Sequence, residues 1–263
     1  MPRPTQVPVR ATVSEAWALL RGHPARLMLP LLVVAVGATA VAEGARALAY
    51  LTIFADEPLL RPGDASSVAS NPVLFVLFVA AALETLFWLV ARGGTIVAVA
   101  RIKSGKPVAL AESLDPAFTR MGGIVAQGIM WSGVLGGLLL SLLGAVLLPY
   151  VGARLALGTE VLLLEGRSPV GAFASSWAMM RGRVIAWLGA LSMALAACVV
   201  PAFVVVAALG FLVGGNREVE IVSTAVAAVL LAAALVPVIA FLTTVTTLFY
   251  LRAKEIDGGQ RTA

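Results

Sequence analysis

The sequence predicts an all-α, polytopic membrane protein in which six transmembrane helices form three hairpin repeats, each preceded by a cytoplasmic interfacial amphipathic helix. The chain is 60% hydrophobic and only 13% charged, whereas soluble domains carry roughly 25% charged residues. Six segments are apolar over the ~20 residues that a helix needs to cross about 30 Å of hydrocarbon. In addition, segments 17–22 and 177–182 share the pattern Trp-Ala-x-x-Arg-Gly, which indicates a repeated unit.

The six apolar segments follow one another along the whole chain. The expected spans cover about residues 25–42 with a helical extension to 54, 72–90, two spans within 122–164, 184–213 and 221–250. The stretch 122–164 has only Arg154 and Glu160 as charged residues. Because it is too long for one span, it is expected to fold back near residues 139–144.

A short helix is expected before each pair of spans. In the first unit Ser14 can cap a helix that carries Trp17. In the third unit Ser168 followed by Pro169 is a favourable helix start, and the aromatic Trp177 lies on the apolar face of the helix that follows.

The middle copy of this short helix departs from the other two. It carries Leu114 and Phe118 on one face, but Pro116 is expected to break or restart the helix. We therefore expect a single transmembrane domain over residues 1–263, built from repeat units at about 12–100, 107–165 and 168–252.

The distribution of basic residues predicts the orientation. Most arginines and lysines lie beside the ends of segments that would share one membrane face with both termini. The opposite face carries only Arg46, Arg61 and Arg217, together with acidic residues. Basic residues are enriched on the cytoplasmic side of membrane proteins, so the pattern predicts a multipass protein of the bacterial plasma membrane with both termini in the cytoplasm. The net charge of +5 is then a topology signal and does not indicate nucleic-acid binding.

Four charged residues within the apolar segments are candidates for an intramembrane site: Glu84, Arg92, Arg154 and Glu160. An ionised side chain at the centre of a spanning helix costs about 2.5 to 3.5 kcal/mol and rarely occurs without a partner or water. One interpretation is a polar pathway or headgroup site between the second and fourth spans. The other is a structural pair between Glu84 and Arg154, with Arg92 and Glu160 near the cytoplasmic boundary.

Small residues recur every four positions in the third span, at Gly133, Gly137 and Ser141. Such a strip lets two helices approach closely. We expect it to serve packing within the molecule in preference to dimerisation.

The sequence contains few of the residues and motifs that are typical of catalytic sites. It has one histidine, His23, and one cysteine, Cys198, and it contains no nucleophile-elbow or phosphate-loop motif. We therefore expect no catalytic site, no metal site and no cofactor.

The segment 164–182 resembles the glycerophosphoryl diester phosphodiesterase membrane-domain family and related bacterial six-span proteins. In that family a glutamate ends the fourth span, as Glu165 does here, and the next unit opens with the pattern Ala-x-x-x-Ser-Trp-x-x-x-Arg-Gly, which this chain has at 172–182. Segment 237–252 is similar to the terminal span of the family. The resemblance implies an all-helical membrane module. It does not imply phosphodiesterase activity, because the acidic residues and histidines of the catalytic domain are missing.

The function predicted from these features is non-enzymatic organisation or handling of lipids, including anionic lipids, or of partner membrane proteins or a second copy of the chain. This predicted function depends on aromatic and basic side chains that would anchor the protein at the level of the lipid headgroups. These anchors are Trp17, Arg21, Phe118, Arg120, Trp177 and Arg181. The alternative is a small transporter with a polar route around Glu84 and Arg154.

Overall fold

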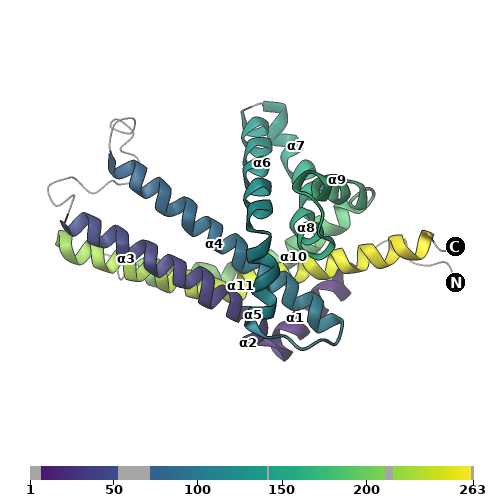
Figure 1. The fold of residues 1–263 in the computed structure, drawn as a ribbon, viewed down its shortest axis with the longest axis horizontal. Helices are drawn as coiled ribbons and strands as arrows, with labels where there is room; N and C mark the ends of the chain where they lie inside the picture. The colour runs from purple at the N-terminus through teal and green to yellow at the C-terminus, as the bar shows by residue number, and fades with distance from the viewer. Residues whose placement is uncertain (1–6, 53–71, 141, 211–215, 262–263) are drawn as a thin grey trace.

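The computed structural model describes residues 7–52, 72–140, 142–210 and 216–261. Every regular element within these ranges is a helix. Five of the helices are long and apolar enough to cross a membrane, or six if the pair Pro169–Met179 and Val184–Cys198, bent by 99°, is one span. The all-α class is confirmed, and the helices are those of a multipass membrane protein (Figure 1).

The chain begins with helix α1 (Val9–Gly22) and continues through α2 (Pro24–Pro30), a π-helical stretch η1 (Leu31–Val36) and α3 (Gly37–Thr52). The prediction that Ser14 caps α1 is wrong, because its hydroxyl donates to the carbonyl of Ala11 inside the helix. The helix starts earlier because extended Pro8 precedes it, and both the N–H and the hydroxyl of Thr12 donate to the carbonyl of Pro8.

Helices α4 (Pro72–Lys103) and α5 (Leu110–Thr119) follow. The turn between them contains Gly105 at φ +68°, a conformation that glycine adopts without strain. The expected break at Pro116 is wrong, because α5 runs through it. Proline removes one backbone donor, and the carbonyl left without its partner belongs to Glu112, which lies on the exposed side of α5 where water can replace that donor.

The predicted fold-back near residue 140 is confirmed, since α6 (Met121–Leu139) and α7 (Leu142–Leu155) pack against each other. The chain then breaks at Leu157 before α8 (Gly158–Glu165). The predicted start of α9 (Pro169–Met179) is also confirmed, because the Ser168 hydroxyl accepts the N–H of Gly171 at 3.3 Å.

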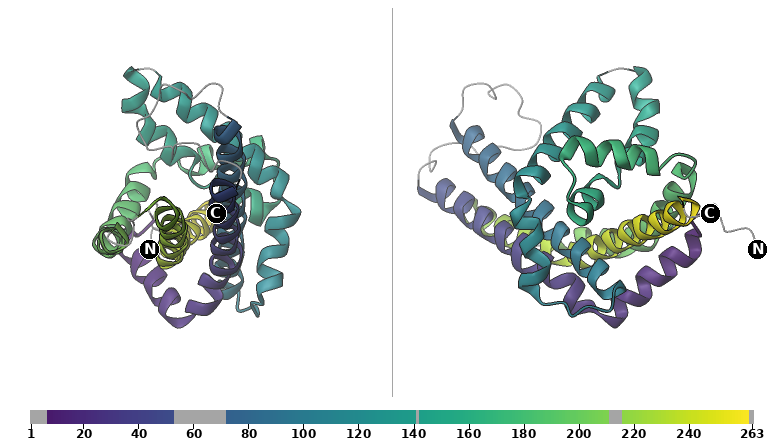
Figure 2. Two further views of the ribbon diagram at one scale, coloured as in Figure 1. Left: turned by 90° about the vertical axis from the view of Figure 1, so that its left-hand side faces the viewer. Right: turned by 45° about the vertical axis from the view of Figure 1, so that its right-hand side comes forward.

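The last helices are α10 (Val184–Gly210) and α11 (Arg217–Arg261). With 45 residues, α11 is about 68 Å long at 1.5 Å per residue, so it extends well beyond the span expected at 221–250. Figure 1 shows α3 running beside α11, while α6 and α7 project across the direction of α11. The further views in Figure 2 show the same arrangement. The three predicted hairpin repeats are therefore not evident as equivalent units.

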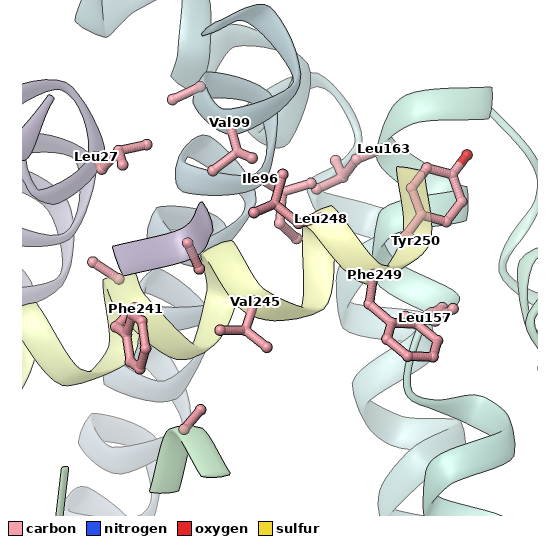
Figure 3. Close-up of a cluster of buried hydrophobic side chains, with 14 of the residues drawn as sticks. Leu27, Ile96, Val99, Leu157, Leu163, Phe241, Val245, Leu248, Phe249 and Tyr250 are labelled. Carbon is pink, nitrogen blue, oxygen red and sulfur yellow. The ribbon is translucent and has the colours of Figure 1, made fainter. Parts of the chain in front are cut away.

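The buried core forms around the middle and end of α11. Figure 3 shows Phe241, Val245 and Leu248 projecting from α11 among side chains of neighbouring helices. The α4 backbone approaches α5 and α8 closely here, since a Cβ atom added at Gly93 would lie 2.9 Å from Ala117 Cβ. Helix α4 packs against α5, α8 and α11.

Candidate functional site

Glu84 is held by α3. Its Oε1 accepts a hydrogen bond from the Thr39 hydroxyl at 2.7 Å, and its Oε2 lies 3.1 Å from Arg46 Nη2. The predicted pairing of Glu84 with Arg154 is therefore wrong. The reason is that the first span continues as α3, which packs along α4 and brings Arg46 to Glu84, whereas Arg154 belongs to α7.

Arg92 and Glu160 form a second, separate pair. Arg92 Nη2 lies 3.1 Å from Glu160 Oε1, and the Glu160 side chain is 0% exposed. Glu160 reaches Arg92 because the break at Leu157 places the first turn of α8 against α4. The position of both residues near the cytoplasmic boundary stays a prediction.

Gln127 contributes a polar group that the sequence reasoning missed. Its side chain is 4% exposed, and Nε2 donates to the carbonyl of Gly158 at 3.0 Å. This bond ties α6 to the first turn of α8, next to Glu160. A lone amide in an otherwise apolar span is the signal that could have identified it.

Arg154 is buried in an aromatic environment. Its guanidinium carbon lies 4.5 Å from the centre of the Trp177 ring and 5.7 Å from that of Tyr150, so both rings can stabilise the cation. The Ser176 hydroxyl donates to the Arg154 carbonyl at 2.8 Å and accepts the N–H of Leu157 at 3.2 Å. Helix α9 therefore supplies a hydrogen-bonding partner for backbone groups at the break between α7 and α8.

The two Trp-Ala-x-x-Arg-Gly copies have different contacts. Trp17 is 47% exposed, meets Phe241 edge to face and carries the Arg21 guanidinium 5.3 Å above its ring. Trp177 is 38% exposed and contacts Arg154, while Arg181 is exposed. Only in the first copy does the arginine of the pattern lie over the tryptophan of the same pattern.

Arg120 of the middle copy caps a helix. Its Nη1 donates to the carbonyls of Leu162 and Leu163, at 2.8 and 2.5 Å, which satisfies carbonyls at the end of α8. The guanidinium also lies against Gly166, at φ +72°. Nη1 of Arg120 thus binds the protein's own backbone, and a role of Arg120 as an interfacial anchor stays a prediction. Phe118 remains 43% exposed.

The predicted packing strip on α6 does not pack within the described part of the molecule. A Cβ atom added at Gly133 or Gly137 would meet no neighbouring atom within 4 Å, and both glycines are exposed. Ser141 lies outside the described residues. The expectation of internal packing is wrong for the two glycines, and contact with a second copy stays a prediction.

We call one end of the molecule the basic end. It comprises α1, the start of α2, the end of α4, α5, α9, the last turns of α11 and the segments that lead into α5 and α9. Glu15 of α1 binds Lys103 of α4 at 2.5 Å and also Arg252 of α11. Burial opposes ionisation of Glu15, but hydrogen bonds and charge from Lys103 and Arg252 outweigh it and hold the pKa of that carboxyl below its usual value. One carboxylate thus holds two cations, and the three side chains together keep one positive charge in excess.

Among the described residues, the cations of the basic end form two sets. Ion pairs with Asp or Glu involve Arg101, Lys103, Arg167, Arg183, Arg252 and Lys254. No acidic partner is found within the described ranges for Arg10, Arg21, Arg26, Lys106, Arg120 and Arg181, of which Arg120 binds backbone carbonyls. The charge of the second set is not compensated by a described acidic side chain.

Arg10, Trp17 and Arg21 form a continuous surface that we call the α1 stripe. At 100° per residue the three lie within about 40° of one another around α1, and all are exposed. Thr12 and Ala16, on another face of the helix, are buried. The α1 stripe therefore faces away from the packed molecule.

In the described parts of the chain, no group of three or more His, Cys, Asp or Glu side chains could hold a metal ion. Comparison of the chain with protein-family models, with curated proteins and with solved structures finds no match. The family resemblance of segment 164–182 stays a prediction.

Proposed function

We propose that the protein is a non-enzymatic integral membrane protein that binds anionic lipid headgroups through the α1 stripe. The observation that carries this proposal is the juxtaposition of Arg10 and Arg21 with the half-exposed indole of Trp17. Arginine attracts lipid phosphate, and tryptophan is enriched at the boundary between headgroups and acyl chains. One exposed face of α1 thus provides both kinds of contact.

The same proposal includes a topology. Basic residues favour the cytoplasmic side, so the basic end and both termini lie in the cytoplasm of a bacterial cell. In this arrangement α1, α5 and α9 are interfacial helices, each leading into a span that begins at α2, α6 or α10. The 99° bend between α9 and α10 supports this reading, because a chain that leaves the membrane surface to cross the bilayer must turn sharply.

A transporter with a polar route around Glu84 and Arg154 is the alternative. The contacts give it less support, because Glu84 is bound to α3 residues and Arg154 to two aromatic rings. The described charges form separate pairs that join helices and give no continuous polar path.

The α1 stripe can be tested by replacing Arg10 and Arg21 with glutamine. Each basic residue near an anionic surface contributes about 1 kcal/mol, so the double variant should bind phosphatidylglycerol about 30-fold more weakly. Affinity can be measured by native mass spectrometry of protein released from nanodiscs. The R10K/R21K variant keeps the charge and should retain most of the affinity.

A second control removes the same charge elsewhere. In the K106Q/R181Q variant two other exposed cations are lost, while the α1 stripe is intact. The proposal predicts a clearly smaller loss than for R10Q/R21Q. Equal losses in the two variants would attribute binding to net charge alone and contradict a lipid site on α1.

A further inference from the structure

A groove of about 1100 Å³ opens at the basic end between α9 and the last turns of α11. In Figure 1 α9 lies above the C-terminal part of α11, and the two helices are in contact. The α9 wall consists of the small residues Gly171, Ala174, Ser175 and Ala178 together with Met179, and the α11 wall contributes Lys254 and Asp257. The small residues of α9 leave space that no described side chain fills.

Glu165, at the end of α8, organises the charges in this groove. Its Oε1 accepts hydrogen bonds from the Tyr250 hydroxyl at 2.8 Å and pairs with Lys254 Nζ at 3.0 Å. Its Oε2 accepts a hydrogen bond from Arg167 Nε at 2.9 Å. One carboxylate therefore holds two cations, and their combined charge exceeds its own.

Arg167 keeps most of its hydrogen-bonding capacity. Only its Nε is used, so the two terminal Nη groups have no partner among the described residues, and its side chain is 54% exposed. The Lys254 side chain is 51% exposed. A guanidinium held by one nitrogen presents a planar pair of donors, which matches two oxygens of a phosphate group.

The second acidic residue of the groove does not cancel this charge. Asp257 accepts two hydrogen bonds from Arg183, Nη1 to Oδ2 at 3.1 Å and Nη2 to Oδ1 at 2.5 Å. The Arg183 side chain is only 8% exposed, so Asp257 is bound to Arg183 and does not pair with Arg167 or Lys254. Two carboxylates against three cations leave the groove with an excess of positive charge.

We propose that this groove binds the phosphate group of a phosphate mono- or diester through Arg167 Nη and Lys254 Nζ. Glu165 is a positioning residue that holds both cations, and the group esterified to the phosphate lies along the small-residue face of α9. The site is separate from the α1 stripe, so it can exist whether or not α1 binds lipid. The phosphate can belong to a lipid headgroup or to a soluble molecule.

The test uses the full chain in phosphatidylcholine nanodiscs and two probes. Inorganic phosphate is titrated by isothermal calorimetry, and dioleoyl phosphatidic acid is added to the nanodiscs and measured by native mass spectrometry. R167Q should weaken binding of at least one probe about 10- to 100-fold, because a charge-assisted hydrogen bond pair is lost. R181Q removes an exposed arginine outside the groove and should leave the affinity unchanged.

The two probes distinguish the source of the phosphate. An Arg167-dependent loss for inorganic phosphate assigns the groove to soluble phosphate compounds, and a loss confined to phosphatidic acid assigns it to lipid headgroups. The R10Q/R21Q variant should keep the groove's affinity, which separates this result from that of the α1 stripe. Absence of binding of either probe, or equal losses in R167Q and R181Q, would overturn the proposal.

E165Q separates positioning from net charge. This variant makes the groove more positive, so attraction by charge alone predicts tighter binding. Positioning by Glu165 predicts weaker binding, by about tenfold, because Arg167 and Lys254 are released. Because E165Q also removes an acceptor of Tyr250, K254Q is the companion variant. It keeps the Glu165 bonds to Tyr250 and Arg167 and should weaken binding as well; unchanged affinity in K254Q would contradict the assignment of Lys254.

Discussion

Replacing Arg92 with methionine should lower the free energy of unfolding by about 3–5 kcal/mol, the range found when one partner of a buried ion pair is removed. Arg92 is the only cation found within ion-pair distance of Glu160 among the described residues, and Glu160 is fully buried. Its carboxylate would remain inside the helix bundle without compensation. Unfolding can be followed by steric trapping in bicelles.

The double variant R92M/E160M should recover much of this loss. Replacing both charged partners with apolar side chains of similar volume is often neutral or stabilising, since the desolvation penalty disappears with the charges. K106M is the control, because Lys106 is exposed and has no acidic partner in the described ranges; it should change stability by less than about 0.5 kcal/mol. A double variant as unstable as R92M would show that the pair itself is not the cause.

Introducing leucine at Gly93 should destabilise the protein by about 1–3 kcal/mol or more, the usual effect of overpacking. The first added carbon alone would lie 2.9 Å from Ala117 Cβ and 3.1 Å from Leu163 Cδ1. The alanine has no rotamer into which it can move, so α4 and α5 must separate. The thermal midpoint in detergent measures the effect.

Gly133 provides a matched control for this substitution. G133L adds the same side chain to a helix interior and gains the same intrinsic helix propensity, but nothing lies within 4 Å of its Cβ position. Its thermal midpoint should not fall. Equal destabilisation by G93L and G133L would contradict the close approach of α4 to α5.

The sequence was sufficient to predict features that depend on local chemistry. Ser168 and Pro169 mark the start of α9 because capping and a fixed φ act within one turn. The fold-back near residue 140 follows from length, since an apolar stretch with few charges cannot remain in one span. Such signals need no knowledge of neighbouring helices.

The partners of the membrane charges could not be predicted in the same way. Glu84 and Arg154 both lie within apolar segments, so pairing them was the simplest way to neutralise both. The sequence predicts that Arg46 lies in a helical extension of the first span, and α3 confirms this helix, but the sequence does not indicate which helix packs beside it. Only the packing of α3 along α4 decides that Arg46 reaches Glu84.

Glycine patterns illustrate the same difference. The strip at Gly133 and Gly137 has the spacing of a helix contact, yet these positions are open within the described molecule. Gly93, in a pair of glycines with no such repeat, lies at a close approach of three helices. Periodicity shows which residues share a face, but it does not show what lies against that face.

The charges within the apolar segments hold helices together and do not line a water-filled route. Thiol labelling of single cysteines tests this most directly, in a variant with Cys198 replaced by alanine. Ala91 is fully buried next to Arg92, and Ala11 is exposed on α1. A membrane-impermeant, water-soluble maleimide should label A11C in open membrane fragments and should leave A91C unlabelled. Labelling of A91C at a rate close to that of A11C would reveal a water-filled route through the helices and contradict the claim.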